Sequence, residues 1–598
     1  MLQYKKNRLD YGRQLNPPPG YKLDMAVATT YSLDLFALLS IPVALFYSRD
    51  LDSDVKENRM DILNAIQKTG DSLKVYCQRG KIGKPKTINK LIASVEDCIY
   101  EILPDEERMS FHPKIWVIRY TGTGNDVLYR VIILSRNLSL DRSYDIAFFL
   151  EGFKSSKKQE KNIPLVDYLN HLSSLSDFKN SNQFIKDLSK TEFKLEDPFN
   201  DFSFHPFGFG KYKNPLKNIS FDELLIISPF VDNSSLKHFA QNVGGKKYLF
   251  SRKEELDKIE VNVLEQYAVY AFSSRVVEGE ADTEHDEEKG DEAQPQHLHA
   301  KLFIGSNGKN STQWYLGSAN CTNPALQRNG EFLIKLDSSD KKAGIKDIIN
   351  ILLSPSDELE IFEPYHRENK EVVAEEEYDF RPYMHQLLIF LNEPSNIIAK
   401  CYLSENEKYT VHLITEESRL FINKDLLIQM APYGWKGDMR VVDGSGDYSF
   451  EGISLVNLSP FLVWKLIYTP TGEEKEFMMK TDILLPEGRK QAIFRSIIEN
   501  QEKFFQFIQF LLGENPHQME FLAGEKNKTN ASNGSAAIRK HEAPLLEDLM
   551  MAASRDPHKL EEIDGIMKML KTKEAEDLIP EEFSRFWKVF QRILDDKK

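Results

Sequence analysis

The sequence predicts an α/β protein in which two lobes of similar design form a pseudo-twofold monomer, followed by a small β-rich domain and a helical C-terminal region. The first observation is a repeat: residues 111–137 and 298–320 both contain His-x-Lys, an apolar run, a Gly/Asn-rich turn, a second apolar run and Ser-x-Asn. The second observation is that a strand, a helix and a further strand precede each copy. Alternating strands and helices are typical of α/β layers, so the repeated order predicts two facing lobes.

The first half of the chain supplies the elements of the first lobe. Residues 25–30 and 73–78 are short apolar runs that predict strands. Residues 32–46 predict a helix that Ser32 caps and that Pro42 bends or interrupts. The first motif hairpin follows these elements.

The second half begins again with an apolar strand at 224–230 and a helix at 236–243, before the second motif hairpin. Beyond residue 371 the pattern changes to several short β-like runs and then to a strongly periodic apolar helix. We therefore expect four parts: 1–215 (first lobe with an N-terminal arm), 216–370 (second lobe), 371–490 (mixed or β-rich domain) and 491–598 (helical, with a polar linker near 524–538).

Composition sets bounds on the function. The chain has 598 residues, of which 41% are hydrophobic and 28% charged, as in ordinary globular proteins. Its formal net charge of −15 argues against a general nucleic-acid coat protein, although a local basic groove is compatible with it. The four cysteines form no C-x-x-C pair, and the N-terminus has no apolar signal-peptide core. We expect a cytoplasmic protein without zinc clusters, disulfide frameworks or membrane segments.

The repeated motif brings the same polar groups to each lobe. Because side chains alternate between the faces of a strand, the His and Lys of each His-x-Lys point the same way. The antiparallel return of the hairpin then brings the Asn of Ser-x-Asn close to them. The predicted catalytic residues are His112, Lys114, Asn137, His299, Lys301 and Asn320, and the predicted supporting residues are Ser135, Asp145, Ser318 and Glu331.

These residue types suit the cleavage of a phosphodiester. One neutral histidine can attack phosphorus and form a phosphohistidine, while the other gives its proton to the leaving oxygen and then activates water. We favour His112 as the nucleophile, although the sequence leaves the order open. The two lysines supply positive charge in place of a metal, so no metal or cofactor is expected. Asp145 and Glu331 are the candidates for fixing the histidine tautomers.

The paired motif resembles the signature of the phospholipase D superfamily, a duplicated H-x-K-x4-D with a following G-S-x-N. The resemblance covers about residues 25–340 and is closest in the second copy, which ends Gly317-Ser318-Ala319-Asn320. The first copy, Ser135-Arg136-Asn137, lacks the preceding Gly, and neither copy has the motif Asp. In lacking that Asp and keeping His, Lys and Asn, the chain is similar to the tyrosyl-DNA phosphodiesterases of that superfamily. Residues 10–35 also look like bacterial members, which implies a role in anti-phage or other mobile-element defence.

The resemblance implies a nuclease or an enzyme that processes nucleic-acid ends, with DNA favoured as substrate. Candidate contacts to a nucleic-acid backbone are Arg79, Lys81, Lys84, Lys86, Arg119 and Arg136. Two alternatives remain open from the sequence: a lipid phosphodiesterase, for which helix 495–513 is the candidate interfacial element, and a catalytically silent scaffold subunit. A helicase or ATPase partner that docks on the C-terminal region, and a homodimer, are further expectations.

Overall fold

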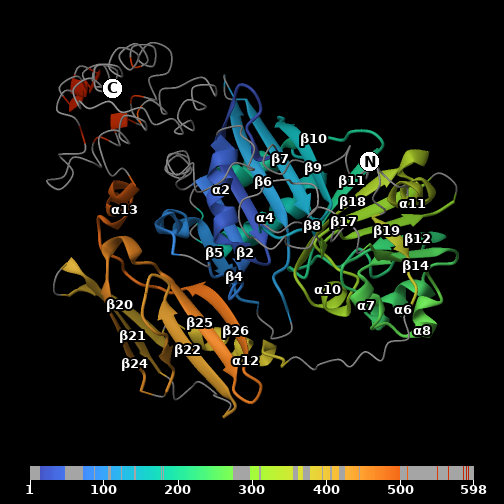
Figure 1. Ribbon diagram of the computed structural model, residues 1–598. Helices are drawn as coiled ribbons and strands as arrows, with labels where there is room; N and C mark the ends of the chain where they lie inside the picture. The colour runs from blue at the N-terminus through green and yellow to red at the C-terminus, as the bar shows by residue number, and fades with distance from the viewer. Residues whose placement is uncertain are drawn as a thin grey trace, which may run out of the picture.

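The computed structural model describes residues 14–46, 72–273, 297–353, 361–367 and 378–497, apart from short gaps inside these ranges, and isolated positions from 508 onward. Figure 1 shows two α/β lobes side by side, with a smaller β-rich domain against the first lobe. Most of the expected helical region 491–598, with its linker, lies outside the described residues, and so does Lys86.

The first lobe is built on a seven-stranded sheet with the order β10-β9-β7-β6-β1-β3-β5. Strand β3 is parallel to both β1 and β5. All other neighbouring strands in this sheet are antiparallel. The bounds are β1 (Tyr21–Thr30), β3 (Leu73–Gln78), β5 (Ile99–Ile102), β6 (Ile115–Gly122), β7 (Val127–Leu134), β9 (Ala147–Lys154) and β10 (Thr191–Lys194).

The second lobe repeats this topology in an eight-stranded sheet with the order β11-β18-β17-β16-β12-β13-β14-β19. Strands β12, β13 and β14 are parallel, as β1, β3 and β5 are. The hairpin β16–β17 corresponds to β6–β7, and only β19 has no counterpart among the described strands of the first sheet. The bounds are β11 (Asp201–Phe207), β12 (Glu223–Ile227), β13 (Lys247–Ser251), β14 (Ala268–Phe272), β16 (Leu302–Ser306), β17 (Thr312–Gly317), β18 (Glu331–Ser338) and β19 (Phe362–Pro364).

The prediction of a duplicated α/β fold, which the resemblance to the phospholipase D superfamily also implies, is therefore confirmed by the strand order. The lobes divide earlier than the expected boundary at residue 215, because β11 pairs with β18 in the second sheet. The helix cap also differs from the prediction. Asp34, and not Ser32, accepts hydrogen bonds from the amides of Phe36 and Ala37, and α2 (Leu35–Phe46) continues through position 42.

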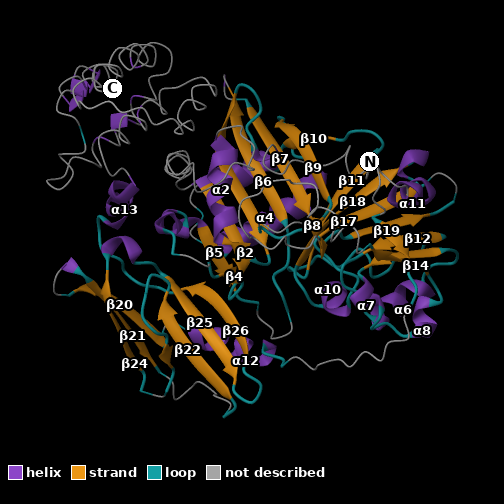
Figure 2. Cartoon of the chain, viewed as in Figure 1, coloured by secondary structure: helices purple, strands orange, loops and turns teal. Residues whose placement is uncertain are grey.

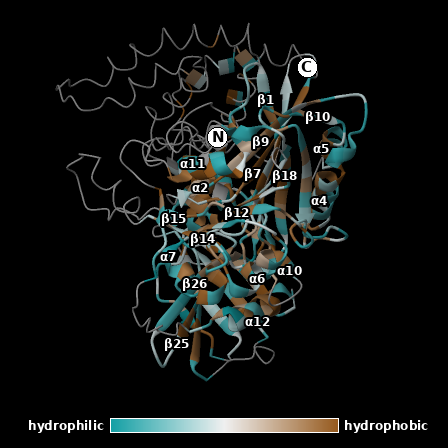
Figure 3. Cartoon of the chain, turned by 90° about the vertical axis from the view of Figure 1, so that its right-hand side faces the viewer, coloured by the Kyte–Doolittle hydropathy of each residue, from teal (hydrophilic) through white to brown (hydrophobic). Residues whose placement is uncertain are grey.

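The two sheets share one apolar core. Alternate residues of β1 face opposite sides, so that Val27 packs in this shared core while Ala26 and Ala28 pack under α2. The helices in the shared core are α4 (Ile163–Ser174), α5 (Ser181–Leu188) and α11 (Ile345–Leu353). The outer face of the second sheet is covered by α6 (Asn233–Gln241), α7 (Lys253–Leu256), α8 (Val261–Leu264) and α10 (Asn323–Gln327). Figure 2 shows these helices around the two sheets, and Figure 3 shows apolar residues concentrated on strands and helices.

The β-rich domain is joined to the first lobe through a common sheet. Two short strands of the lobe, β2 (Leu33–Asp34) and β4 (Ile82–Gly83), extend the sheet of the domain in the order β2-β4-β26-β25-β22-β23. The other bounds are β20 (Ile397–Leu403), β21 (Tyr409–Thr415), β22 (Leu426–Pro432), β23 (Arg440–Val441), β24 (Asp447–Ile453), β25 (Phe461–Tyr468), β26 (Glu473–Lys480), α12 (Arg381–Asn392) and α13 (Arg489–Ile497). Of the helices in the described ranges, none is both long and apolar enough to cross a membrane.

Candidate active site

His112 and Lys114 lie in the segment that leads into β6. The amide of His112 donates to the Gly330 carbonyl at 2.9 Å, so this segment of the first lobe is held by the second lobe. The Lys114 side chain is almost fully buried, and its Nζ donates to the His112 carbonyl and to His112 Nε2, both at 3.0 Å. The structure thus brings the first predicted His and Lys into direct contact.

His299 and Lys301 occupy the equivalent place before β16. The short strands β8 (Ser143–Tyr144) and β15 (His297–Leu298) pair across the two lobes. The amide of His299 donates to the Tyr144 carbonyl at 2.8 Å. The buried Lys301 Nζ donates to the carbonyls of His299, at 2.8 Å, and of Ser135, at 3.1 Å. Each His-x-Lys segment is therefore bonded to the opposite lobe.

Ser135 and Ser318 make equivalent pairs of hydrogen bonds in the two lobes. The Ser135 amide donates to the Ile146 carbonyl, and the Ile146 amide donates back to Ser135 Oγ at 2.8 Å. Ser318 exchanges the same pair of bonds with Phe332, with the Phe332 amide 2.9 Å from Ser318 Oγ. Both serines are fully buried. Since Ile146 corresponds to Phe332, the residues before them, Asp145 and Glu331, occupy equivalent positions.

Glu331 orients the histidine of the other lobe. Its carboxylate is completely buried and accepts a hydrogen bond from His112 Nδ1 at 2.9 Å. Ser318 Oγ and Asn329 Nδ2 also donate to it, the latter at 3.3 Å. Because an ionised carboxylate only accepts, the proton of neutral His112 resides on Nδ1, and Nε2 carries the lone pair.

Asp145 is less enclosed than Glu331. Its carboxylate lies 3.6 Å from Arg136 Nε, and about a quarter of the side chain is exposed. Its position matches that of Glu331, so the pseudo-twofold relation directs Asp145 toward the segment that carries His299.

In the part of the chain that the structure describes, the side-chain amide oxygens of Asn137 and Asn320 have no hydrogen-bond partner. Both oxygens are buried. Unsatisfied buried polar atoms are rare in native structures and often mark a ligand position. Since the oxygen and nitrogen of an amide exchange by a half-turn of the side chain, each asparagine can also present a donor to a bound oxyanion.

Burial and neighbouring charges shift the acid–base properties of the site. Burial lowers the pKa of His112; the Glu331 charge opposes this effect and Lys114 adds to it. Burial also holds the pKa of Lys114 well below its usual range, with Glu331 raising it and Lys301 lowering it further. Two lysines thus lie near a single buried glutamate, an arrangement that a bound phosphate would compensate.

Tyr31 was not singled out by the sequence. Its ring centroid lies 5.1 Å from that of His112, and the Nζ atoms of Lys81 and Lys114 lie 5.4 Å and 6.0 Å from the Tyr31 ring centroid. It follows directly after β1, and no motif marks it.

Among the residues that the structure describes, no group of three or more His, Cys, Asp and Glu side chains is placed to hold a metal ion.

The basic residues that the sequence assigned to a nucleic-acid backbone separate into two groups. Arg119 is 13% exposed and forms ion pairs with Asp24 and Asp187. It therefore stabilises the first lobe, and we no longer include it among the residues proposed to contact a nucleic-acid backbone. Lys84 is paired with Glu476.

Arg79 donates to the Leu391 carbonyl at 3.3 Å, so it joins the first lobe to α12 of the β-rich domain. Lys81 lies near the histidine site through Tyr31, and Arg136 precedes Asn137 in the chain and is paired with Asp145. These two residues remain in the proposed nucleic-acid surface.

Comparison with solved structures finds yeast tyrosyl-DNA phosphodiesterase. Its crystal structure matches at 12% identity over 55% of this chain and 84% of that chain, with a TM-score of 0.32. A histidine-to-alanine variant matches at 11% identity over 55% of this chain and 85% of that chain, with a TM-score of 0.33. At these scores the likeness carries no argument about the activity of this chain. No protein-family model matches the chain, and no curated protein matches it in sequence.

Proposed function

We propose that the protein is a metal-independent phosphodiesterase that cleaves nucleic acid through a phosphohistidine intermediate. The observation that carries this proposal is the environment of His112. Its Nδ1 donates to the buried Glu331, which leaves the Nε2 lone pair beside the Lys114 ammonium. A neutral imidazole with an oriented lone pair, next to positive charge, suits nucleophilic attack on a phosphodiester.

His112 is assigned as the nucleophile. Burial lowers its pKa, so the ring is neutral at pH 7 and attacks without first losing a proton. In the first step Nε2 forms a bond to phosphorus, the bond from phosphorus to the leaving oxygen breaks, and that oxygen takes a proton from His299. In the second step His299 removes a proton from water, the resulting hydroxide attacks phosphorus, and His112 leaves with its electron pair.

The lysines and asparagines stabilise the charge on phosphorus. Lys114 and Lys301 are both buried, so their interaction with an oxyanion is little weakened by water. Lys114 releases its bond to Nε2 as the histidine attacks, and its ammonium then faces a non-bridging oxygen. Asn137 and Asn320 donate to the same oxygens from the two lobes, which would satisfy their side-chain amides.

We also propose that the substrate of this phosphodiesterase is a nucleic acid. Lys81 places positive charge beside the histidine site, whereas Arg136, next to Asn137 in the chain, is paired with Asp145 and would contact a phosphate only by sharing that pair. A single-stranded or frayed end of DNA is the favoured substrate. A role in anti-phage defence, a cytoplasmic location, a helicase or ATPase partner and a homodimer stay predictions from the sequence.

The test uses bis-p-nitrophenyl phosphate in the presence of EDTA. Replacing His112 or His299 by Ala should lower the steady-state rate by about 100-fold or more. Because p-nitrophenolate leaves without a general acid, the His299→Ala variant should still form the phosphohistidine and release a burst of one equivalent of product. His112→Ala should release none.

The control is His171→Ala, which removes an exposed imidazole of α4 and should retain the wild-type rate. A burst from His112→Ala instead of His299→Ala would reverse the assignment of the nucleophile. If the wild type and both variants are equally inert toward this ester and toward DNA, the scaffold alternative replaces the enzymatic proposal. The interfacial helix of the lipid alternative falls almost wholly outside the described residues.

A further inference from the structure

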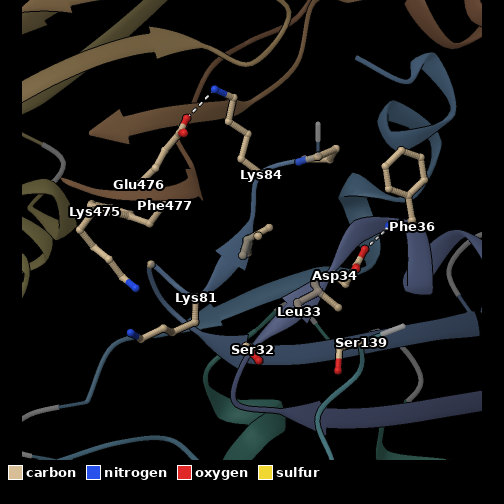
Figure 4. Close-up of a pocket in the computed structure, with 14 residues that line it drawn as sticks. Ser32, Leu33, Asp34, Phe36, Lys81, Lys84, Ser139, Lys475, Glu476 and Phe477 are labelled. Atoms are coloured by element: carbon tan, nitrogen blue, oxygen red, sulfur yellow. Dashed lines mark hydrogen bonds and ion pairs between the residues drawn. The ribbon is translucent and has the colours of Figure 1, made fainter. Parts of the chain in front are cut away.

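We infer that the β-rich domain forms part of the substrate-binding surface, where it and the first lobe enclose a cationic cavity for a nucleotide of a single-stranded nucleic acid. This inference rests on the proposed function and names the part of the substrate that lies beside the cleaved phosphate. The cavity has a volume of about 530 Å³ and is lined by residues of β2, β4 and the start of α2 in the first lobe and by residues of β26 in the domain (Figure 4). Its size is that of sites for small ligands, and so suits one nucleotide better than a duplex.

Two lysines from different domains converge on this cavity. Figure 4 shows the side chains of Lys81 and Lys475 pointing toward one another. In the described part of the chain, neither ammonium has a carboxylate within ion-pair distance, whereas neighbouring Lys84 is neutralised by Glu476. Like charges that face each other without a counter-ion repel, and an anion between them removes this repulsion.

Two chains of contacts connect the wall of the cavity with the histidine site. On one side, the Lys81 ammonium lies 5.4 Å from the Tyr31 ring, which itself lies 5.1 Å from the His112 ring. On the other side, the amide of Asp34 in the cavity wall donates to the Leu138 carbonyl at 2.9 Å, one residue beyond Asn137. On this basis we place the nucleotide next to the cleaved phosphate beside Lys81.

The lining offers groups for both parts of a nucleotide. Lys81 and Lys475 face a phosphate at one end of the cavity, and Phe36, which is half-buried in the wall at the other end, provides an aromatic ring for a base (Figure 4). A cationic groove combined with an aromatic side chain is the usual chemistry by which proteins bind single strands with little sequence preference. A lipid headgroup would use the lysines but not the aromatic ring.

The experiment compares Lys475→Glu with Lys400→Glu. Both lysines are exposed on strands of the β-rich domain, but Lys400 on β20 does not line the cavity. Binding is measured by fluorescence anisotropy with a labelled single-stranded DNA oligonucleotide over a range of salt concentrations. Turnover is measured with bis-p-nitrophenyl phosphate, which is too small to need the cavity.

Lys475→Glu should weaken oligonucleotide binding about tenfold at low salt. It should also lower the slope of log binding constant against log salt concentration by about one, with turnover of the small ester unchanged. Lys400→Glu should change neither quantity. Equal weakening by both substitutions, no weakening by Lys475→Glu, or a loss confined to anionic lipid vesicles would overturn the inference. A wild type that is inert toward both the ester and DNA but binds the oligonucleotide through Lys475 would refute the catalytic proposal and leave the cavity assignment standing.

Discussion

Replacing Glu331 by Gln tests the mechanism most directly, because the substitution removes one charge and keeps the shape. The Glu331 carboxylate is fully buried, accepts from His112 Nδ1 and raises the pKa values of both His112 and Lys114. Without that charge both pKa values should fall. An amide nitrogen turned toward Nδ1 would also favour the tautomer that carries its proton on Nε2, and that tautomer cannot attack phosphorus.

The expected magnitude follows from the type of bond that is lost. A hydrogen bond to a charged group contributes about 1.5–3 kcal/mol. At about 1.4 kcal/mol for each factor of ten, kcat/KM should fall about 10- to 150-fold. Because the nucleophile must be neutral, the acidic limb of the pH profile reports the His112 pKa, and it should move to lower pH in the variant.

The assay is the pH dependence of kcat/KM for bis-p-nitrophenyl phosphate, with thermal melting as a check on folding. The matched control is Glu223→Gln at the start of β12, which should leave the profile in place. An acidic limb that moves to higher pH would contradict the role given to Glu331. So would a loss smaller than about threefold in a variant that melts like the wild type.

Three further substitutions test the fold that supports the site. Gly317→Ala should lower stability by at least about 2 kcal/mol, because φ is +147° and a Cβ would lie 2.2 Å from the Phe332 carbonyl oxygen. Arg489→Ala should destabilise the junction with the β-rich domain by about 3–5 kcal/mol, since it leaves the buried Glu96 carboxylate without its ion pair. Burial lowers the pKa of His205 from 6.5 to about 4, so the unfolded chain binds the proton first as the pH falls. The stability that this histidine contributes is therefore lost between about pH 6.5 and 4, by about 1–3 kcal/mol, and His205→Gln should remove that loss.

Thermal and urea denaturation measure all three effects. Gly244→Ala is the control for Gly317, because a Cβ at Gly244 meets open space. Adding Glu96→Gln to Arg489→Ala should recover part of the lost stability, and no recovery would show that packing and not charge holds the junction. A wild type that is equally stable at pH 7 and pH 5, or a His205→Gln variant with the same pH dependence, would contradict the role of that histidine.

The repeat revealed the fold and the central residues, because the same polar groups recur at the same places on two hairpins. The spacing predicted that His112 lies with Lys114 and His299 with Lys301, and each lysine does contact its histidine residue, although both pairs come just before a strand and not within one. The duplicated strand order then follows from the repeated order of elements.

Contacts between segments that are far apart in the chain could not be predicted from the sequence. Nothing in the pattern indicates that Glu331 orients the histidine of the opposite lobe, since this depends on how the lobes dock. The charge of Arg119 is neutralised by Asp24 and Asp187, which are far away in the chain. Composition marks such a residue as basic, and only the fold shows whether the charge is free for a ligand.

The exchange of contacts between lobes has a consequence for how the two halves act. His112 belongs to the first lobe and its orienting carboxylate to the second, while Lys301 of the second lobe is held by the Ser135 carbonyl of the first. Neither lobe therefore contains a complete site. Residues that act through one another give non-additive effects, so adding Glu331→Gln to His112→Ala should lower the rate by less than about twofold beyond His112→Ala alone. A further loss as large as that of Glu331→Gln in the wild type would show that Glu331 acts on the reaction by a route other than His112.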